Sequence, residues 1–162
     1  MTTALTIGFF DGVHLGHQKL LKRLREHPHA TILTFSNHPQ SLFKPPAPEL
    51  LISLEEKKRL LKPYADLVVV LPFTTEFAAT PFDQLLQTFA PSHLILGTGS
   101  AFGKDREGNE ANVRNYARTR GITVEYIEKE LFRNEPVSSS RIRQALADGN
   151  ATLAHQLLGR KT

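Results

Sequence analysis

Short apolar runs alternate with amphipathic helical patterns along this chain, and this alternation limits the possible fold more than any other feature. The apolar runs of strand length lie at residues 5–10, 30–35, 66–71, 93–96 and 122–127. The helical patterns between and after them lie at residues 16–26, 53–62, 81–89, 109–120, 140–147 and 151–158. Strands that alternate with helices form parallel sheets with right-handed crossovers. The sequence therefore predicts an α/β fold, with a parallel sheet of about five strands flanked by helices.

Local signals mark some of the boundaries between these elements. Ser53 followed by Glu56 is a capping box, which predicts a helix start, and Gly149 predicts a helix end. Residues 36–51 contain four prolines, so we expect a long connection without regular structure. Residues 97–109 are rich in glycine and predict a second irregular segment, again at the carboxyl end of a strand.

Composition limits the size and the environment of the protein. The 162 residues, 40% of them hydrophobic, suit a single domain spanning 1–162. The sequence has no cysteine, which excludes a disulfide framework and is compatible with a reducing cytosol. No apolar stretch approaches the length of a membrane span, and the N-terminus lacks a signal-peptide pattern. We therefore expect a cytoplasmic protein.

The net charge of +4 does not by itself indicate a nucleic-acid partner, because the basic residues are dispersed. Several lie along the helix predicted at 16–26. Lys57, Lys58 and Arg59 follow Glu55 and Glu56, a mixed pattern that predicts a solvated helix face. We therefore expect neither a nucleic-acid nor a membrane partner.

The segment GFFDGVHLGH at residues 8–17 carries the clearest functional signal. It places His14 and His17 three residues apart where a strand meets a helix, in the first helical turn. A helix start favours an anion through its free N–H groups and its dipole, and each imidazole can donate a hydrogen bond to a phosphate. Gly12 and Gly16 leave room for a ligand to approach the backbone.

The histidine pair also fits two interpretations that involve no phosphate. The histidines can be polar loop residues without a function, since short motifs have false-positive matches. Zinc is a weaker alternative, because helical zinc ligands are usually spaced i, i+4 and this chain has no cysteine.

A second candidate phosphate site precedes the helix at 140–147. Ser138, Ser139 and Ser140 are followed by Arg141 and Arg143. Ordinary helix capping needs only one of the three hydroxyls. A polyphosphate would use all of them together with a forked guanidinium, and its charge would relieve the unfavourable position of arginines in a first helical turn.

These residues resemble the adenylyltransferase domain of bacterial FAD synthetases, which are bifunctional riboflavin kinase/FMN adenylyltransferases. The pairing of HxGH with a later serine-rich motif is similar to the wider nucleotidyltransferase superfamily. The similar segments are GFFDGVHLGH at 8–17, TFSNHP at 34–39, LLISLEEKKRLL at 50–61, LVVVLPFTTEF at 67–77, FGKDREG at 102–108, SSSRIR at 138–143 and LLGR at 157–160.

The resemblance implies a Rossmann-like fold that transfers AMP from ATP to FMN with Mg²⁺, giving FAD and pyrophosphate. It implies catalytic roles for five residues, His14, His17, Ser139, Ser140 and Arg143. It implies nucleotide binding by Gly8, Phe9, Phe10, Asp11, Gly16, Gly97 and Ser138. It implies flavin binding by Asn37, His38, Pro39, Phe102 and Arg106, although His38 is equally well explained as a turn residue before proline. The metal ligands stay unassigned.

The chain departs from the family pattern at two positions and in one further respect. Gly99-Ser100 stand where relatives have Asp or Asn followed by Phe, and Pro136 stands where relatives often have Arg. Each missing side chain removes a possible partner of FMN, metal or phosphate. The riboflavin kinase domain that is normally fused in the family is absent from this sequence, so we expect no phosphorylation of riboflavin.

Two other functions fit the same residues. A nucleotidyltransferase acting on another phosphorylated acceptor, such as a pantetheine phosphate, a nicotinamide mononucleotide or a polyol phosphate, would need the same HxGH chemistry. A non-catalytic flavin- or nucleotide-binding relative would be motivated by Gly99 and Pro136.

Overall fold

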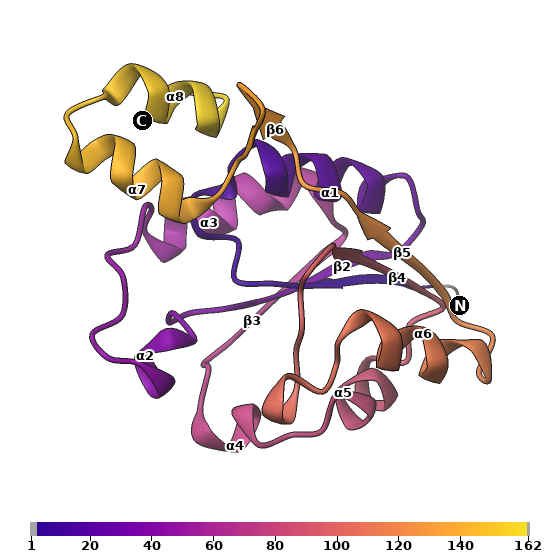
Figure 1. The fold of residues 1–162 in the computed structure, drawn as a ribbon. Coiled ribbons are helices and arrows are strands. Elements are labelled where there is room, and N and C mark those ends of the chain that lie inside the picture. The colour runs from indigo at the N-terminus through magenta and orange to yellow at the C-terminus, as the bar shows by residue number, and fades with distance from the viewer. Residues whose placement is uncertain (1–2, 162) are drawn as a thin grey trace.

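The computed structural model describes residues 3–161, and its centre is a parallel sheet of five strands (Figure 1). These strands are β1 (Ala4–Ile7), β2 (Ala30–Phe35), β3 (Leu67–Leu71), β4 (His93–Gly97) and β5 (Thr123–Ile127). Their order in the sheet is β3-β2-β1-β4-β5, and every neighbouring pair is parallel. The predicted α/β fold is confirmed. The strand order reverses between β1 and β4, which is where open α/β sheets bind ligands.

Helices cover both faces of this sheet (Figure 1). On one face lie α1 (Leu15–Arg25) and α3 (Leu54–Leu61), and on the other lie α4 (Thr75–Ala78), α5 (Phe82–Phe89) and α6 (Glu110–Arg118). Adjacent side chains of β1 point to opposite faces of the sheet, as they do in any strand. Ala4 packs with Leu21 and Leu24 of α1, whereas Leu5 packs with Leu86 of α5. Each face therefore has its own hydrophobic core.

The C-terminal part adds a third hydrophobic cluster at one end of the sheet (Figure 1). It is built from α7 (Ser139–Ala147) and α8 (Ala151–Leu158), next to the hairpin of β6 (Leu131–Phe132) and β7 (Glu135–Pro136). Ile142 and Leu157 are fully buried between these elements. Among residues 3–161, none of the helices combines the length and the apolar character that crossing a membrane requires.

The predicted helix signals have the expected geometry. The Ser53 side chain accepts a hydrogen bond from the backbone N–H of Glu56 at 3.1 Å, so it caps α3. Gly149 follows the end of α7 in a left-handed conformation, at φ 73°. The structure starts α1 at Leu15, with His14 as its N-cap, one residue earlier than the sequence pattern predicts.

The two segments expected to lack regular structure contain short helices, so that expectation is wrong in part. Residues 36–51 include α2 (Gln40–Phe43), which begins directly after Pro39, because proline is tolerated at a helix start. Residues 97–109 include the 3₁₀ turn η3 (Lys104–Arg106). Two further 3₁₀ turns are η1 (Asp11–Val13) and η2 (Lys62–Tyr64).

Candidate active site

The loop between β1 and α1 is held in an unusual backbone conformation. Phe10 and Val13 have φ angles of 57° and 42°, and Gly12 between them has φ 82°. Residues other than glycine rarely occupy this region, least of all β-branched ones such as valine. Phe10 and Val13 are both buried, so their packing holds the turn in place. The apolar run therefore stops being a strand at Ile7, and the chain turns sharply to deliver His14 to the start of α1.

His14 is a buried N-cap whose hydrogen bonds define its tautomer. Its Nδ1 accepts hydrogen bonds from the backbone N–H groups of Gly16 and His17, at 3.1 and 3.3 Å. Burial, with a smaller contribution from the nearby Arg160, lowers the pKa of His14 to about 4. The ring is therefore neutral at pH 7, and since Nδ1 is the acceptor, Nε2 carries the proton. His14 can offer that N–H to a ligand.

His17 lies one helical turn further along and stacks on His14. The two ring centroids are 3.6 Å apart and the ring planes are 17° from parallel. Burial lowers the pKa of His17 well below its ordinary value, and the nearby His14 and Lys57 add to this effect. Among residues 3–161, Nδ1 of His17 is one of the few buried polar atoms without a hydrogen-bond partner. A buried polar atom without a partner is uncommon in folded proteins and calls for an explanation, and the other such atoms in this part of the chain belong to Thr6, His27 and Tyr126.

Two glycines of the motif occupy positions where a side chain would not fit. A Cβ atom at Gly8 would lie 2.9 Å from the ring of Phe10, and one at Gly16 would lie 3.0 Å from the ring of His14. A side chain at Gly16 would also approach the carbonyl of Val137, at 3.5 Å. The starts of α1 and α7 therefore lie side by side, while the tight contact that favours glycine at position 16 is the one with the His14 ring.

The three serines at the start of α7 have different surroundings. Ser138 is the N-cap, and its side chain accepts a hydrogen bond from the N–H of Arg141 at 3.1 Å. The Ser139 hydroxyl donates to the carbonyl oxygen of Asp11 at 2.8 Å. Ser140 is exposed, and among the hydrogen bonds of residues 3–161 none includes its side chain. Capping thus accounts for Ser138, while Ser139 ties α7 to the histidine loop.

Asp11 joins three distant parts of the chain. Its carboxylate is buried and forms an ion pair with the guanidinium of Arg143 on α7. It also accepts hydrogen bonds from the backbone N–H of Leu51, at 3.0 and 3.2 Å. Arg143 in turn donates from Nε to the carbonyl oxygen of Glu49 at 2.7 Å. The residues predicted to hold ATP phosphates therefore also hold the end of the 36–51 connection in place.

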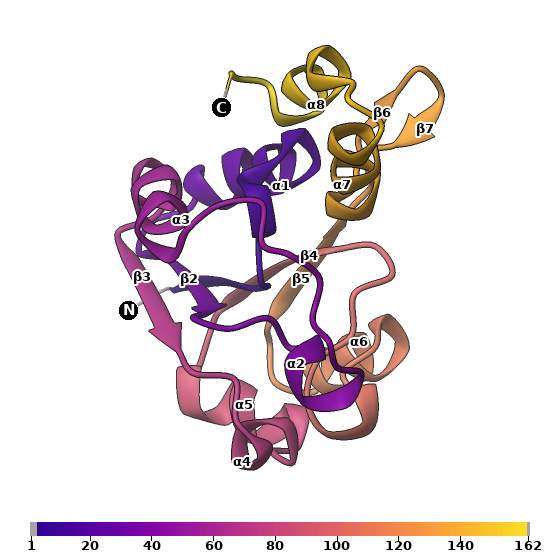
Figure 2. The same cartoon turned by 90° about the vertical axis from the view of Figure 1, so that its left-hand side faces the viewer.

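An aromatic cavity of about 840 Å³ opens beside the histidine loop, at the carboxyl ends of the strands. Its lining residues come from the carboxyl ends of β1 and β2 and from the segments that follow β1, β2, β3 and β4. Figure 2 shows the backbone of these segments. The lining residues are Ile7, Gly8, Phe9, Phe35, His38, Pro39, Gln40, Phe43, Phe73, Phe77, Ala78, Ser100, Ala101, Phe102, Gly103, Asp105 and Arg106. Ring surfaces dominate this lining, and a few polar groups stand among them, as in pockets for flat organic ligands.

Four of the five residues predicted to bind flavin line this cavity, namely His38, Pro39, Phe102 and Arg106. The ring of His38 meets the ring of Phe9 edge-on, with centroids 4.9 Å apart. Asn37 is not part of the lining. Its side-chain amide accepts from the backbone N–H of Phe73 and donates to the Phe73 carbonyl, at 2.7 and 3.0 Å, so it fixes the loop after β3.

Gly97 lies near the cavity without lining it. Its carbonyl accepts hydrogen bonds from the backbone N–H and the hydroxyl of Ser100, at 3.1 and 2.7 Å. This tight turn passes through Gly99, at φ 79°. Ser100 belongs to the cavity lining, so one of the two departures from the family pattern is at the candidate site itself. Pro136, the other, is exposed in the hairpin of β6 and β7.

Lys57 contradicts the prediction of a solvated helix face. Its side chain is buried, with 3% of the residue exposed, whereas Lys58 and Arg59 are exposed as predicted. The reason is its position in α3, where it shares a face with Leu61, four residues further on. That spacing is the signal that could have identified it, but the surrounding charges in the sequence hid it.

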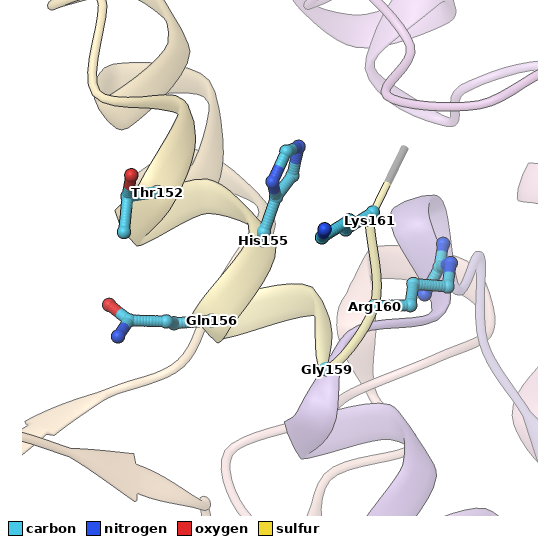
Figure 3. Close-up of a pocket in the computed structure, with 6 residues that line it drawn as sticks. All are labelled: Thr152, His155, Gln156, Gly159, Arg160 and Lys161. Atoms are coloured by element: carbon cyan, nitrogen blue, oxygen red, sulfur yellow. The ribbon is translucent and has the colours of Figure 1, made fainter.

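A second, open hollow of about 470 Å³ lies at the C-terminal end of α8 (Figure 3). It is lined by Thr152, His155, Gln156, Gly159, Arg160 and Lys161. The guanidinium of Arg160 donates to the carbonyls of Gly12 and Val13, so this residue braces the histidine loop. None of the residues predicted to bind nucleotide or flavin belongs to this lining.

Comparison with known proteins identifies the family. The family model of FAD synthetase matches residues 1–141. The chain belongs to the FAD synthetase family. The match includes the histidine loop and the start of the serine motif, and the fold and the family membership expected from the sequence are confirmed.

Several relatives of known sequence are each called a bifunctional riboflavin kinase/FMN adenylyltransferase. The protein of Listeria monocytogenes is 31% identical over 96% of this chain, and that of Haemophilus influenzae is 35% identical over 97%. The protein of Escherichia coli K12 is 34% identical over 96%. The chain spans about half the length of each of these three proteins, namely 53%, 55% and 53%.

Two solved structures share the fold. A crystal structure titled a macrolide-efflux protein from Streptococcus pneumoniae has a TM-score of 0.85 at 26% identity, covering 98% of this chain and 55% of that one. Pantothenate synthetase from Thermus thermophilus has a TM-score of 0.53 at 18% identity, covering 97% and 75%. The second likeness concerns the fold alone.

Proposed function

We propose that this chain is an FMN adenylyltransferase, which transfers AMP from ATP to FMN and releases pyrophosphate and FAD. The observation that carries the proposal is the meeting of two unlike sites. The starts of α1 and α7, with His14, His17 and Ser139, converge beside a cavity of aromatic side chains. A dinucleotide that joins adenosine to a flavin through two phosphates needs both kinds of surface. Membership of the FAD synthetase family supports the same reaction.

The proposed reaction needs alignment more than proton transfer. An oxygen of the FMN phosphate forms a bond to the α-phosphorus of ATP, while the bond from that phosphorus to the oxygen bridging to the β-phosphorus breaks. Pyrophosphate leaves with the electron pair of that bond. The FMN phosphate is already an anion at neutral pH, so no general base is required. Catalysis then consists of holding the two phosphates in line and stabilising the charge that develops.

His14 and His17 are the proposed partners of the α-phosphate. Nε2 of His14 is a neutral N–H donor held in place by the two backbone groups that its Nδ1 accepts from. His17 has a buried ring nitrogen still without a partner and stacks on His14. Donors fixed before the reaction stabilise developing charge without a cost for reorganisation.

The start of α7 is the proposed seat of the β- and γ-phosphates. Ser138 caps the N–H of Arg141, but within residues 3–161 none of the hydrogen bonds uses the N–H groups of Ser139 and Ser140 or the exposed Ser140 hydroxyl. Arg143 is paired with Asp11 in this state, so the proposal requires its guanidinium to turn in part from that carboxylate to a phosphate. An arginine fork can exchange one anion for another, because both present the same pair of oxygens.

The flavin ring is proposed to occupy the aromatic cavity. The volume of about 840 Å³ is within the range of about 300–1,000 Å³ found for small-molecule pockets. Phe9 and Phe102 offer ring surfaces, and the exposed Arg106 at the rim can meet the phosphate or the polar chain of FMN.

Magnesium is proposed to arrive with the nucleotide. Within residues 3–161 no group of three or more metal-ligating side chains is gathered, and Asp11 already has Arg143 and Leu51 as partners. The protein residues alone therefore do not fit a metal site, and no step is assigned to the metal here. Mg²⁺ is commonly held by substrate phosphates, water and one or two carboxylates.

We also propose that residues 1–162 act as one nucleotidyltransferase domain and that it works in the cytoplasm, where ATP is available. The support for a cytoplasmic location is the cysteine-free sequence, which suits a reducing compartment.

The direct test is chromatographic detection of FAD after incubation with ATP, FMN and Mg²⁺. We expect FAD and pyrophosphate in equal amounts. His17→Ala should lower the rate by about a hundredfold or more, as removal of a preorganised donor does. The matched control is His29→Asn, because His29 is exposed and its φ of 53° suits asparagine.

Absence of FAD from a folded protein that still binds FMN would contradict the proposal. Consumption of ATP with a pantetheine phosphate or a nicotinamide mononucleotide would then identify a different acceptor. Binding without any turnover would instead identify a flavin- or nucleotide-binding relative.

A further inference from the structure

Lys57 is a buried cation that the proposed chemistry does not use. It lies in the middle of α3, on the side of the helix that faces the sheet, and only 3% of it is exposed. Within residues 3–161, none of the ion pairs includes it. Burying an ammonium without an ion-pair partner is costly, and an apolar side chain of similar length would avoid this cost. Its presence therefore calls for a role.

The ammonium joins the ends of two strands at the candidate site. Its Nζ donates to the carbonyl oxygen of Phe35, the last residue of β2, at 2.7 Å. It also donates to the carbonyl oxygen of Phe9, in the loop after β1, at 2.9 Å. The hydroxyl of Thr34 donates to the same Phe9 carbonyl, at 2.9 Å. The backbone of Phe9 is thus held from two sides, by a helix and by a neighbouring strand.

Phe9 forms part of the wall between the two halves of the candidate site. Its ring lines the aromatic cavity and meets the ring of His38 edge-on. Lys57 lies over the same ring, with Nζ 3.8 Å from the ring centroid. The next residue, Phe10, meets the ring of His17 edge-on, at 5.2 Å between centroids. A shift of the Phe9 backbone would therefore disturb both the flavin cavity and the histidine pair.

The charge of Lys57 also reaches the histidines and the cavity. Burial lowers the pKa of Lys57 to about 8, and the carboxylate of Asp11 opposes this shift. Lys57 in turn helps to lower the pKa values of His17 and His38. Besides burial, the groups that act on His17 are thus His14 at the N-cap of its own helix and Lys57 on α3. A fixed positive charge beneath a phosphate site favours an anion above it.

We propose that Lys57 is a positioning residue for AMP transfer: it fixes the Phe9 wall between the phosphate and flavin sites and supplies a positive charge close to both. The reaction named in this inference is the one given under the proposed function, and the inference rests on it to that extent. The positioning role itself is argued from the contacts of Lys57 with Phe9 and Phe35. Lys57 contacts backbone and ring rather than the reacting atoms, and it acts through the residues that do.

The test compares Lys57→Met with Lys58→Met. Methionine keeps the length of the buried side chain and removes its charge and its donors, while Lys58 is the exposed neighbour on the same helix, paired with Glu55. Lys57→Met should lower kcat for FAD formation about tenfold or more, because small misplacements at a reacting centre are costly. Lys58→Met should leave kcat and both KM values unchanged. An unchanged kcat in folded Lys57→Met would overturn the proposal.

A second measurement does not depend on turnover. The pKa of His17, followed by NMR with the resonance assigned through a His17→Gln variant, should rise in Lys57→Met because a nearby positive charge is gone. Lys57→Arg keeps the charge and should keep that pKa low, while its wider guanidinium restores only part of kcat. A His17 pKa that is the same in Lys57→Met and in the unaltered chain would contradict the electrostatic part of the role.

The unaltered protein supplies a test if Lys57→Met fails to fold. Saturation with a non-hydrolysable ATP analogue should raise the pKa of the Lys57 ammonium from about 8, because the phosphates bring negative charge close to it. No change on saturation would overturn the proposal. A lack of FAD in the unaltered chain would contradict the proposed function alone, since both NMR measurements report on Lys57 without any turnover.

Discussion

The phosphate side and the flavin side of the candidate site are built by different means. On the phosphate side, polar contacts join residues far apart in sequence, such as Asp11 with Arg143 and Ser139 with the Asp11 carbonyl. On the flavin side, aromatic rings meet edge-on, with centroids 5.1 Å apart for Phe35 and Phe73. One of the rings that line the cavity, that of Phe43, is 69% exposed, so this side of the site is less closely packed than the buried Asp11 pair.

The difference reflects what each side has to bind. Charge that develops during a reaction is stabilised best by groups already held in place, so the phosphate side is tied down before any ligand arrives. A flat apolar ring needs contact area more than exact hydrogen bonds, and aromatic side chains provide this area while leaving the wall adaptable. We therefore expect substitutions of the residues that tie the phosphate side together to lower both stability and AMP transfer, and substitutions on the flavin side to weaken flavin binding alone.

The largest effect is expected from Arg143→Met. This substitution leaves the buried Asp11 carboxylate without its cation, which costs about 3–5 kcal/mol in comparable buried pairs. Urea unfolding measures the loss of stability, and isothermal titration with ATP should show weaker binding. The matched control is Arg114→Met, which breaks the exposed pair with Glu110 and should cost less than about 1 kcal/mol. Equal losses in the two variants would remove the distinction between a preformed phosphate side and ordinary surface pairs.

The next effect is a loss of stability in acid that depends on His14. Its pKa in the folded chain is about 4, below the 6.5 of an unfolded chain, so the unfolded state takes up the proton first as the pH falls. The stabilising effect of neutral His14 is complete above about pH 6.5 and is lost towards pH 4, by up to about 1.4 kcal/mol per pH unit. The free energy of unfolding, measured with urea between pH 4.5 and 7.5, should therefore depend less on pH in His14→Gln than in the unaltered chain.

The exposed His29 provides the control for this acid effect. His29→Asn should keep the steep dependence on pH, because it changes an exposed position and leaves the buried His14 unaltered. Parallel curves for His14→Gln and the unaltered chain would show that the phosphate side does not hold its histidines neutral.

On the flavin side, Phe102→Leu should weaken FMN binding about fivefold, since an aromatic contact contributes about 1 kcal/mol beyond its area. Quenching of flavin fluorescence measures this affinity, and the affinity for ATP should stay the same. Phe132→Leu is the control, because Phe132 packs in the C-terminal cluster and does not line the cavity. A loss of ATP affinity in Phe102→Leu would mean that the two sides are not separable.

The smallest effect separates two neighbouring serines. Ser139→Ala removes the hydrogen bond to the Asp11 carbonyl and should lower the free energy of unfolding by about 1 kcal/mol. Ser140→Ala should leave stability nearly unchanged, because the exposed Ser140 hydroxyl is not bonded to another segment. It should lower the affinity for pyrophosphate, because that hydroxyl is a proposed phosphate donor. Thermal unfolding and competition with pyrophosphate distinguish the two. Equal stability of both variants would contradict the tying role of Ser139.

Much of the fold was predictable because it depends on local pattern. The alternation of apolar runs and helical stripes predicts the parallel sheet, and the helix at 151–158 has the predicted bounds. The strand predicted at 5–10 is shorter in the structure, because Phe10 adopts a left-handed conformation that only the surrounding packing explains. Short helices such as α2 and α4 escaped prediction, since four residues are too few to show a helical period.

The sequence by itself determined which chemical groups the site contains, because HxGH at a strand end and three serines before a helix are local patterns of donors. It also determined the family through those same segments. Only the tertiary structure decided how these groups meet. The pairing of Asp11 with Arg143 and the burial of Lys57 against the carbonyls of Phe9 and Phe35 join segments far apart in the chain. Such contacts follow from the packing of α3 and α7 around the sheet, which no local pattern of charge reveals.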